Sequence, residues 1–221
     1  MPTASDVRSA IDRKDVTIAL VEEVSTDDAE RQQAAATAVI KHWESTEWPE
    51  CLVAQSLFTS TNGKSLLTYA QWSSATALQQ SRSASRPDWA ALGIEPGTPK
   101  AYELYRVVRP AVLPDPLPLA RSFPAAVFAM PSQDAARQWV DGLLENEEQN
   151  EGAERAYPGA LAANFHVAAD GTGIFLLSEW ASEEEVVVHI KEVIEPLLEH
   201  MGQGETGPGS LYSFYATVSA A

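Results

Sequence analysis

Two stretches of the chain resemble each other closely enough to decide the fold. Residues 48–74 read WPECLVAQSLFTSTNGKSLLTYAQWSS, and residues 157–182 read YPGALAANFHVAADGTGIFLLSEWAS. Each has an aromatic–proline pair, an alternating run, a short turn, a second run and a tryptophan. Asn62 and Asp170 in the turns lie 108 positions apart (170 minus 62), and Trp72 and Trp180 have the same separation (180 minus 72). This constant spacing indicates an internal duplication.

Each copy predicts the element order strand–helix–strand–strand–helix–strand. Asn62-Gly63 and Asp170-Gly171 favour hairpins, because these pairs tolerate the positive φ of a tight turn. Serine and aspartate before apolar runs predict helix starts, with Ser132 and Ser182 as N-caps. Besides the hairpins, we expect strands at Val16–Val24, Tyr102–Val108, Phe123–Met130 and Leu211–Val218, and helices from Ser25–Asp28 to about Ser45, after Ser73, from Ser132 and over Glu183–Met201.

This order predicts an α+β fold in which each copy forms a four-stranded antiparallel sheet with both helices on one face. The second copy would cover the other face and make an internal pseudo-dimer. We expect a first domain at residues 1–110, a proline-rich linker at 111–121 and a second domain at 122–221. The segment RPAVLPDPLPLA, residues 109–120, leads into and forms most of this linker; its four prolines favour an extended, semi-rigid tether.

Composition excludes several classes of function. The chain has 221 residues, 45% of them hydrophobic, which is enough for a packed core. Its net charge of −16 would repel phosphate backbones and anionic lipids, so we expect no nucleic acid and no membrane partner. Cys51 is the single cysteine, which rules out an intrachain disulfide. With no signal-like N-terminal segment in this sequence, a cytoplasmic location is the simplest expectation.

Histidines and aromatics are the candidate site residues, because no phosphate loop, metal motif or nucleophile motif is present. His42 lies late in the first helix beside Trp43, and His166 lies on a predicted strand. If His166 faces the helices, it lines the cavity. His189 and His200 are read as isolated surface or core histidines, because no acidic or cysteine cluster completes a metal set. Trp72 and Trp180 suit core packing first and a pocket wall second.

The segments YAQWSS and SEWASEEE, each after a hairpin, resemble the antibiotic biosynthesis monooxygenase family. The resemblance covers residues 16–109 and 123–219. It implies tandem ferredoxin-like βαββαβ repeats that form an intramolecular dimeric α+β barrel. Similar proteins include anthrone oxygenases and tandem oxygenases that open an angucycline ring, and haem-degrading enzymes share the fold.

The resemblance to anthrone oxygenases also implies site residues. The family tryptophan matches Trp72 and Trp180, and the family histidine matches His166 in copy two but Phe58 in copy one. The family asparagine and tyrosine are not matched, since Thr68 and Leu176, and Leu78 and Val186, stand there. Copy two is therefore the predicted working copy. The predicted catalytic residues are His166, Trp180 and His42, and the predicted substrate contacts are Trp72, Tyr69, Trp43, Phe165 and Tyr215.

The resulting hypothesis is an oxygenase that acts on a polycyclic aromatic polyketide of the anthrone or angucycline hydroquinone type, in antibiotic biosynthesis. Molecular oxygen would be the co-substrate. No bound metal or cofactor is expected, although reduced flavin from a separate reductase remains an option, and the chain could form a homodimer. The alternative is a non-catalytic protein on the same fold that binds an aromatic ligand or templates a cyclisation. Haem degradation is a third reading, which a Soret band on haem titration would favour.

Overall fold

The computed structural model describes residues 2–220 apart from 82, 84–85, 113–114, 152–156 and 197–208. The chain forms two compact units. Unit 1 consists of Met1–Leu104 and Tyr212–Ala221, and unit 2 consists of Tyr105–Leu211. The boundaries fall inside two strands, so each of these strands contributes residues to both units. The expected division at residues 110 and 122 concerns the two sequence copies and stays a prediction.

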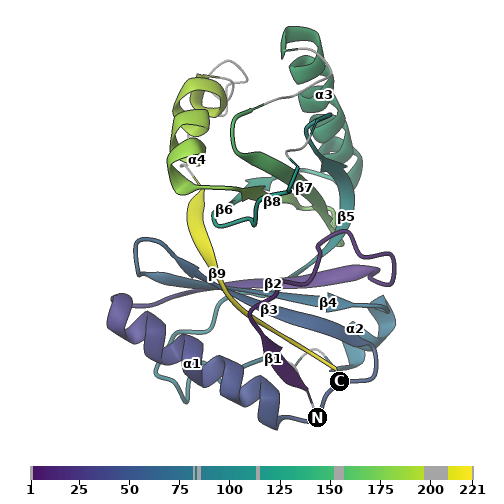
Figure 1. Cartoon of the computed structure of the whole chain (residues 1–221). Helices are drawn as coiled ribbons and strands as arrows, with labels where there is room; N and C mark the ends of the chain where they lie inside the picture. Colours follow the sequence, from purple (N-terminus) through teal and green to yellow (C-terminus); the bar gives the residue numbers. More distant parts are fainter. Residues whose placement is uncertain are drawn as a thin grey trace. The chain divides into compact units, whose positions relative to one another are not determined.

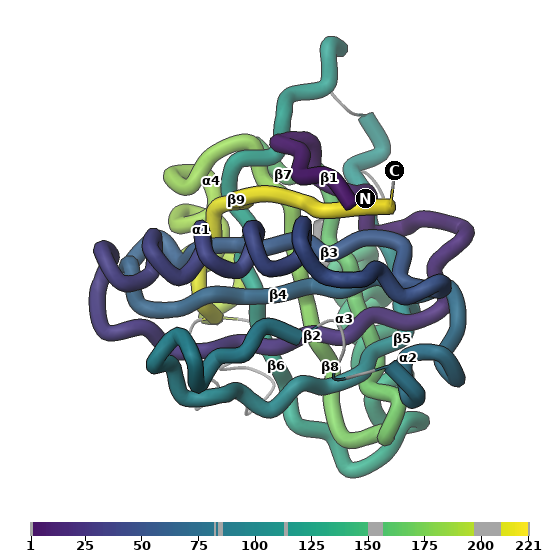
Figure 2. The backbone as a smooth tube through the Cα atoms, turned by 90° about the horizontal axis from the view of Figure 1, so that it is seen from below, coloured from purple at the N-terminus to yellow at the C-terminus, as the bar shows by residue number. Residues whose placement is uncertain are grey.

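Unit 1 is an antiparallel sheet with α1 packed on it. Its elements are β1 (Thr3–Ser5), β2 (Ile18–Ser25), α1 (Ala29–Ser45), β3 (Leu52–Ser60), β4 (Ser65–Trp72), α2 (Ala75–Ser81), the first part of β5 (Lys100–Val108) and most of β9 (Ser210–Ser219). The strands follow the order β1-β9-β3-β4-β2-β5. Helix α1 runs over β3 and β4 (Figure 1, Figure 2).

The core of unit 1 fills the layer between α1 and the sheet. Ala36 and Val39 of α1 pack against Leu57 and Leu66 of the sheet, and all four are buried. Because Ala36 and Val39 are three positions apart, they lie on the same face of the helix. The apolar stripe of α1 therefore fixes which side of the helix meets the strands.

Unit 2 repeats the order of strands and helices of unit 1, with a π-helix added after its second α-helix. It contains β6 (Phe123–Ala129), α3 (Gln133–Glu151), β7 (Ala160–Ala168), β8 (Gly173–Trp180), α4 (Glu183–His189) and η1 (Ile190–Ile194). Strands β7, β8 and β6 lie side by side in that order and are antiparallel. Helix α3 packs on β7 and β8, and α4 packs on β8 (Figure 1).

The two hairpins share one register. Leu52 pairs with Trp72 in β3–β4, and Ala160 pairs with Trp180 in β7–β8. Both hairpins have a bulge directly after this pair, before Ala54 in one and before Ala162 in the other. The 108-residue spacing read from the sequence thus recurs in the strand pairing.

The predicted strands and helices recur in order and type, and β1 is an additional strand. The prediction of a separate four-stranded sheet in each copy is wrong, because β9, the last strand of the second copy, pairs with β3 of the first copy. The α+β class and the antiparallel sheet are confirmed, and both turn glycines have positive φ, 75° at Gly63 and 74° at Gly171. Asp28 and Ser182 cap α1 and α4 by accepting hydrogen bonds from the backbone N–H groups of Arg31 and Glu185. No helix among the described residues is long and apolar enough to span a membrane.

One predicted helix contains a π-turn. The expected helix Glu183–Met201 is α-helical over Glu183–His189, passes through the π-helix η1 (Ile190–Ile194) and is α-helical again at residues 195–196. The N–H of Glu195 donates to the carbonyl of Ile190, five residues back, which is the π pattern. Hydrophobic periodicity cannot distinguish an α-turn from a single π-turn, because their hydrogen bonds span four and five residues and so differ by one residue. Residues 197–201 of the predicted helix lie outside the described residues.

Candidate functional site

A cavity of about 340 Å³ lies inside unit 2, bordered by the sheet and by α3, α4 and η1. This volume falls at the lower end of the range for small-molecule sites. Alternation along the strands creates its floor. Phe165 of β7 and its partner Leu176 of β8 face the cavity, as do Ala163 and its partner Ser178. The principal apolar lining residues are Phe128, Leu143, Leu144, Phe165, Leu176 and Val186.

Three aromatic rings meet at one side of this cavity. The His189 ring centroid lies 4.8 Å from that of Trp180 and 4.3 Å from that of Tyr157. All three side chains line the cavity. Trp180 ends β8 and Tyr157 precedes β7, while His189 ends α4, so the three come from different parts of the unit. The His189 ring is tilted by 59° to the Tyr157 ring and by 42° to the Trp180 ring, so the cluster offers an angled aromatic wall that carries one imidazole.

Helix phase explains why His189 faces the cavity. Val186, His189 and Ile190 all line it, and their spacing of three and four residues places them on one face of the helix. Ser182 fixes the start of α4, because its hydroxyl accepts from the backbone N–H of Glu185. The π-turn begins directly after His189. Single π-turns inside helices are frequent at functional sites.

A few polar groups complete the lining. Arg109, Glu147 and Glu195 carry charges at the cavity, and Ser178 contributes a hydroxyl. These groups can bind a flat ring that carries one or two oxygen atoms. His189 can take up or release a proton. Among the described residues, no group of three or more His, Cys, Asp or Glu side chains could hold a metal ion.

His166 faces the other side of the sheet. Its strand neighbour Phe165 lines the cavity, and successive strand residues point to opposite faces. His166 would line the cavity only if it faced the helices of unit 2. It faces the opposite way and does not line the cavity. The His166 side chain is fully buried, with Nδ1 3.0 Å from the Asn164 carbonyl oxygen and 3.2 Å from that of Phe175. Since carbonyls only accept, we assign the ring proton to Nδ1.

Burial sets the protonation state of His166. Desolvation lowers the pKa of the ring to about 4, against a smaller upward effect of the hydrogen bonds to Phe175 and Asn164. The ring is therefore neutral near pH 7. A base whose conjugate acid has so low a pKa takes up a proton poorly at neutral pH.

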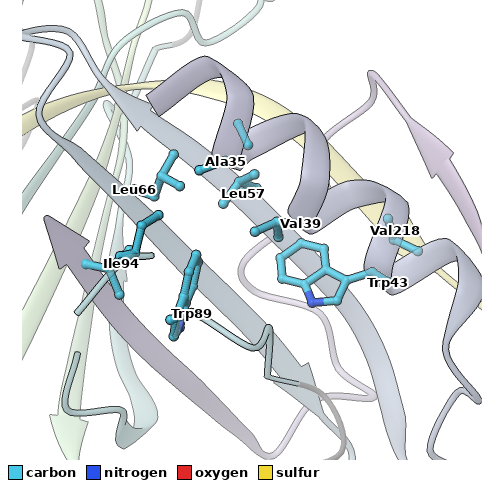
Figure 3. Packing of buried hydrophobic residues seen from close by; sticks show 10 residues of the cluster. Ala35, Val39, Trp43, Leu57, Leu66, Trp89, Ile94 and Val218 are labelled. Atoms are coloured by element: carbon cyan, nitrogen blue, oxygen red, sulfur yellow. The ribbon is translucent and has the colours of Figure 1, made fainter. Parts of the chain in front are cut away.

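The other predicted contacts divide between the two units. Trp180 and Phe165 line the cavity of unit 2. Trp43 and Trp72 are buried in two core clusters of unit 1, and Tyr69 of β4 is 1% exposed. In Figure 3, Trp43 packs close to Val39, between α1 and the strands. The structure therefore brings two of the predicted residues together in the cavity and places these three in unit 1.

Tyr215 and His42 also lie in unit 1. The Tyr215 hydroxyl is 3.0 Å from the Thr37 hydroxyl at the surface of α1. His42 is half-buried near the end of α1, and its carbonyl accepts hydrogen bonds from the backbone N–H and the hydroxyl of Thr46. The Tyr215 contact joins β9 to α1, and the Thr46 contacts close the last turn of α1. The predicted site roles of these two residues stay predictions.

The sequence-based argument missed His189 and Tyr157. Tyr157 belongs to the aromatic–proline pair that marked the repeat, and His189 was read as an isolated residue. A usable signal was the spacing of Val186, His189 and Ile190 along one helix face after Trp180. That spacing identifies a buried helix face, whereas the cavity beneath it depends on tertiary packing.

Comparisons with known proteins extend only to the fold. No family model matches the sequence, and no curated protein matches it. Among solved structures, an anthrone oxidase-like protein is similar over 94% of this chain and 95% of that chain, with a TM-score of 0.68 and 15% identity. A protein from Fusobacterium nucleatum, provisionally assigned as a monooxygenase, covers 92% of this chain and 94% of its own with a TM-score of 0.53 and 11% identity.

A third solved structure, of a protein provisionally assigned as a chlorite dismutase, covers 90% of this chain and 94% of that chain, with a TM-score of 0.51 and 10% identity. Identities this low show a shared fold and nothing finer. The chain thus shares the α+β fold of these proteins.

Proposed function

We propose that unit 2 is an oxygenase domain that binds a flat aromatic substrate of the anthrone or hydroquinone type in its cavity and oxidises it with O₂. The observation that carries the proposal is the cluster of His189, Trp180 and Tyr157 on the wall of an apolar cavity. Such a cavity excludes water from a reactive carbanion. The fold shared with an anthrone oxidase-like protein is consistent with this proposal.

Each part of the site has one role in the proposed reaction. His189 takes a proton from the acidic ring carbon or hydroxyl, and the electron pair stays on the ring. The ring then reacts with O₂. When a ring CH₂ becomes C=O, one oxygen atom enters the product and the other leaves as water, so the substrate supplies all four electrons. Trp180 and Phe165 hold the ring by stacking and apolar contact.

The finer parts of the proposal concern the substrate and the architecture. A polycyclic aromatic polyketide in antibiotic biosynthesis is the substrate class that fits this chemistry. A free reduced flavin, supplied by a separate reductase, would serve if the substrate itself cannot reduce O₂. The repeated hairpin register supports the view that the chain is a tandem duplication, with the two copies forming one dimeric α+β barrel within a single molecule.

Oxygen uptake with anthrone as the probe tests the proposal. The wild-type protein should consume one O₂ per anthrone and form anthraquinone. The His189→Gln variant should lose activity by a factor on the order of 100, the lower end of what a general base contributes. His166→Phe, which installs the residue found at position 58, should retain turnover. Activity that depends on His166 instead of His189 would contradict the assignment of the base.

A non-catalytic ligand-binding role is the second candidate, and the largely apolar lining of the cavity favours it. A carrier for a flat aromatic needs apolar contact area and no proton acceptor. The same experiment separates the two roles. Quenching of tryptophan fluorescence by anthrone, with no more anthraquinone formed than in the absence of protein, both with and without reduced flavin, identifies a binder.

A further inference from the structure

A second concave site lies on the other side of His189. It is a groove of about 290 Å³, lined by Tyr157, Pro158, Glu184, Glu185, Val188, His189, Glu192 and Val193. His189 and Tyr157 line this groove and also the apolar cavity. The paired rings of these two residues, 4.3 Å apart between centroids, therefore form a shared wall between an apolar space and an acidic one.

The groove is acidic beside His189. Glu185 lies four residues before His189 on α4, which is the spacing of neighbours on an α-helix surface, and Glu192 lies in the π-helix η1 that follows. Glu185, His189 and Glu192 all line the groove. Glu184 and Glu192 are exposed, and Glu185 is half-buried and accepts a hydrogen bond from the Ser182 hydroxyl. Nearby carboxylates stabilise an imidazolium ion.

The cavity side of His189 is different. The rings of Trp180 and Tyr157 pack against the imidazole there, and Arg109, Glu147 and Glu195 are the charged residues that line the cavity. A proton released into an apolar space would carry its charge away from water, at a large cost in free energy. The groove offers the proton a hydrated, negatively charged destination.

We propose that His189 passes the substrate proton from the cavity to the groove, where Glu192 and Glu184 favour its release to water. The inference rests on the proposed function. One imidazole nitrogen gains the proton as the substrate bond breaks, and the electron pair stays on the substrate. The N–H proton of the other nitrogen then leaves to water in the groove. The imidazole is neutral again, and each turnover moves one proton from substrate to solvent.

The assignment gives Glu192 a positioning role, because it acts through His189 and lies in the groove. Its matched control is Glu183, an exposed carboxylate at the start of the same helix that does not line the groove. The Glu192→Gln and Glu183→Gln variants change the net charge of the protein equally. A difference between them therefore reports position and not overall charge.

The test combines kinetics with a titration that needs no turnover. At low buffer concentration, Glu192→Gln should lower kcat for anthrone oxidation several-fold, with KM about unchanged, and the Glu184→Gln/Glu192→Gln double variant should lower it by on the order of tenfold. Added imidazole should restore kcat. By NMR, the titration midpoint of the His189 ring should fall by about 0.3 units in Glu192→Gln and stay unchanged in Glu183→Gln.

The outcomes separate the relay from the oxygenase. If wild-type protein oxidises anthrone but Glu192→Gln and the double variant match Glu183→Gln in kcat and in the NMR midpoint, the relay is wrong and the oxygenase stands. A rise in KM at constant kcat also overturns the relay. If wild-type protein consumes no O₂, the proposed function fails and the relay fails with it.

Discussion

Trp180 and Trp72 occupy matching positions in the two hairpins but have different surroundings. Trp180 lines the cavity of unit 2 and contacts His189. Trp72 is fully buried in a core cluster of unit 1 with Ile18 and Leu78. The same residue type thus packs a core in one unit and lines a cavity in the other.

The matched tryptophans give a direct binding prediction. Trp180→Phe should weaken the binding of anthraquinone by up to about tenfold, because an aromatic contact contributes about 0.5–1.5 kcal/mol beyond its buried area. Trp72→Phe should leave the dissociation constant unchanged and lower the free energy of unfolding. Isothermal titration calorimetry and urea unfolding measure the two quantities. Equal effects of the two substitutions on affinity would exclude Trp180 as part of the ligand surface.

The buried His166 should make stability depend on pH. Its pKa is about 4 in the folded protein and about 6.5 in the unfolded chain, so the unfolded chain binds more protons between these values. The free energy of unfolding should therefore fall as pH falls through this window, by roughly 2 kcal/mol between pH 7 and pH 5.

His166→Phe supplies the control for that effect, because phenylalanine does not titrate and stands at the matching position 58. Urea unfolding at pH 7 and pH 5 should show a smaller loss of stability in the variant than in the wild-type protein, by about the same 2 kcal/mol. If both proteins lose equal stability, His166 is not the group that couples folding to pH.

At the level of elements, the hairpin turns are the most constrained features. A Cβ atom on Gly63 would lie 2.8 Å from the Ala29 Cβ atom, and one on Gly171 would lie 2.9 Å from the Gln133 backbone nitrogen. Both glycines also have positive φ. Each turn therefore needs glycine for its backbone conformation and for its contact with the start of the preceding helix, α1 or α3.

Gly63→Ala and Gly171→Ala should each lower the free energy of unfolding, by on the order of 1–2 kcal/mol, because alanine is strained at positive φ and meets the helix start. Chemical unfolding measures the change. Gly142 provides the control, since a Cβ atom there meets nothing within 4 Å and its φ is not in the positive range. Gly142→Ala should be neutral or stabilising in helix α3. A neutral Gly171→Ala would show that the turn tolerates a side chain.

Local signals explain which elements could be predicted from the sequence. Asn62-Gly63 and Asp170-Gly171 specify hairpins through φ, and Asp28 and Ser182 specify helix starts through hydrogen bonds within three residues. These features depend on neighbours in sequence. The order of the elements followed from them, and the 108-residue spacing set the correspondence between the hairpins.

Long-range packing explains what the sequence did not reveal. Strand alternation showed that Phe165 and His166 face opposite ways, but only packing of α3 and α4 decides which face holds the cavity. The same holds for His189, whose place depends on the phase of α4 and on the π-turn behind it. The sequence left open which way His166 faces, and the structure places it on the face of β7 opposite to the cavity.

At the scale of the whole molecule, the two units use the layer between helix and sheet differently. In unit 1, Trp89 and Ile94 of the loop after α2 pack into this layer with Val39, Leu57 and Leu66 (Figure 3). In unit 2, the corresponding layer holds the 340 Å³ cavity. This contrast supports the proposal that one copy works on a ligand and the other has a structural role.

The position of a bound ligand tests this account most directly. A crystal structure with anthraquinone should show the ring inside unit 2, against Trp180 and His189, with Phe165 on the floor of the site. Such a result would place the imidazole of His189 next to the reacting part of a substrate analogue. A ring bound in unit 1 near Trp43 or Trp72, or against the sheet face that carries His166, would contradict the account.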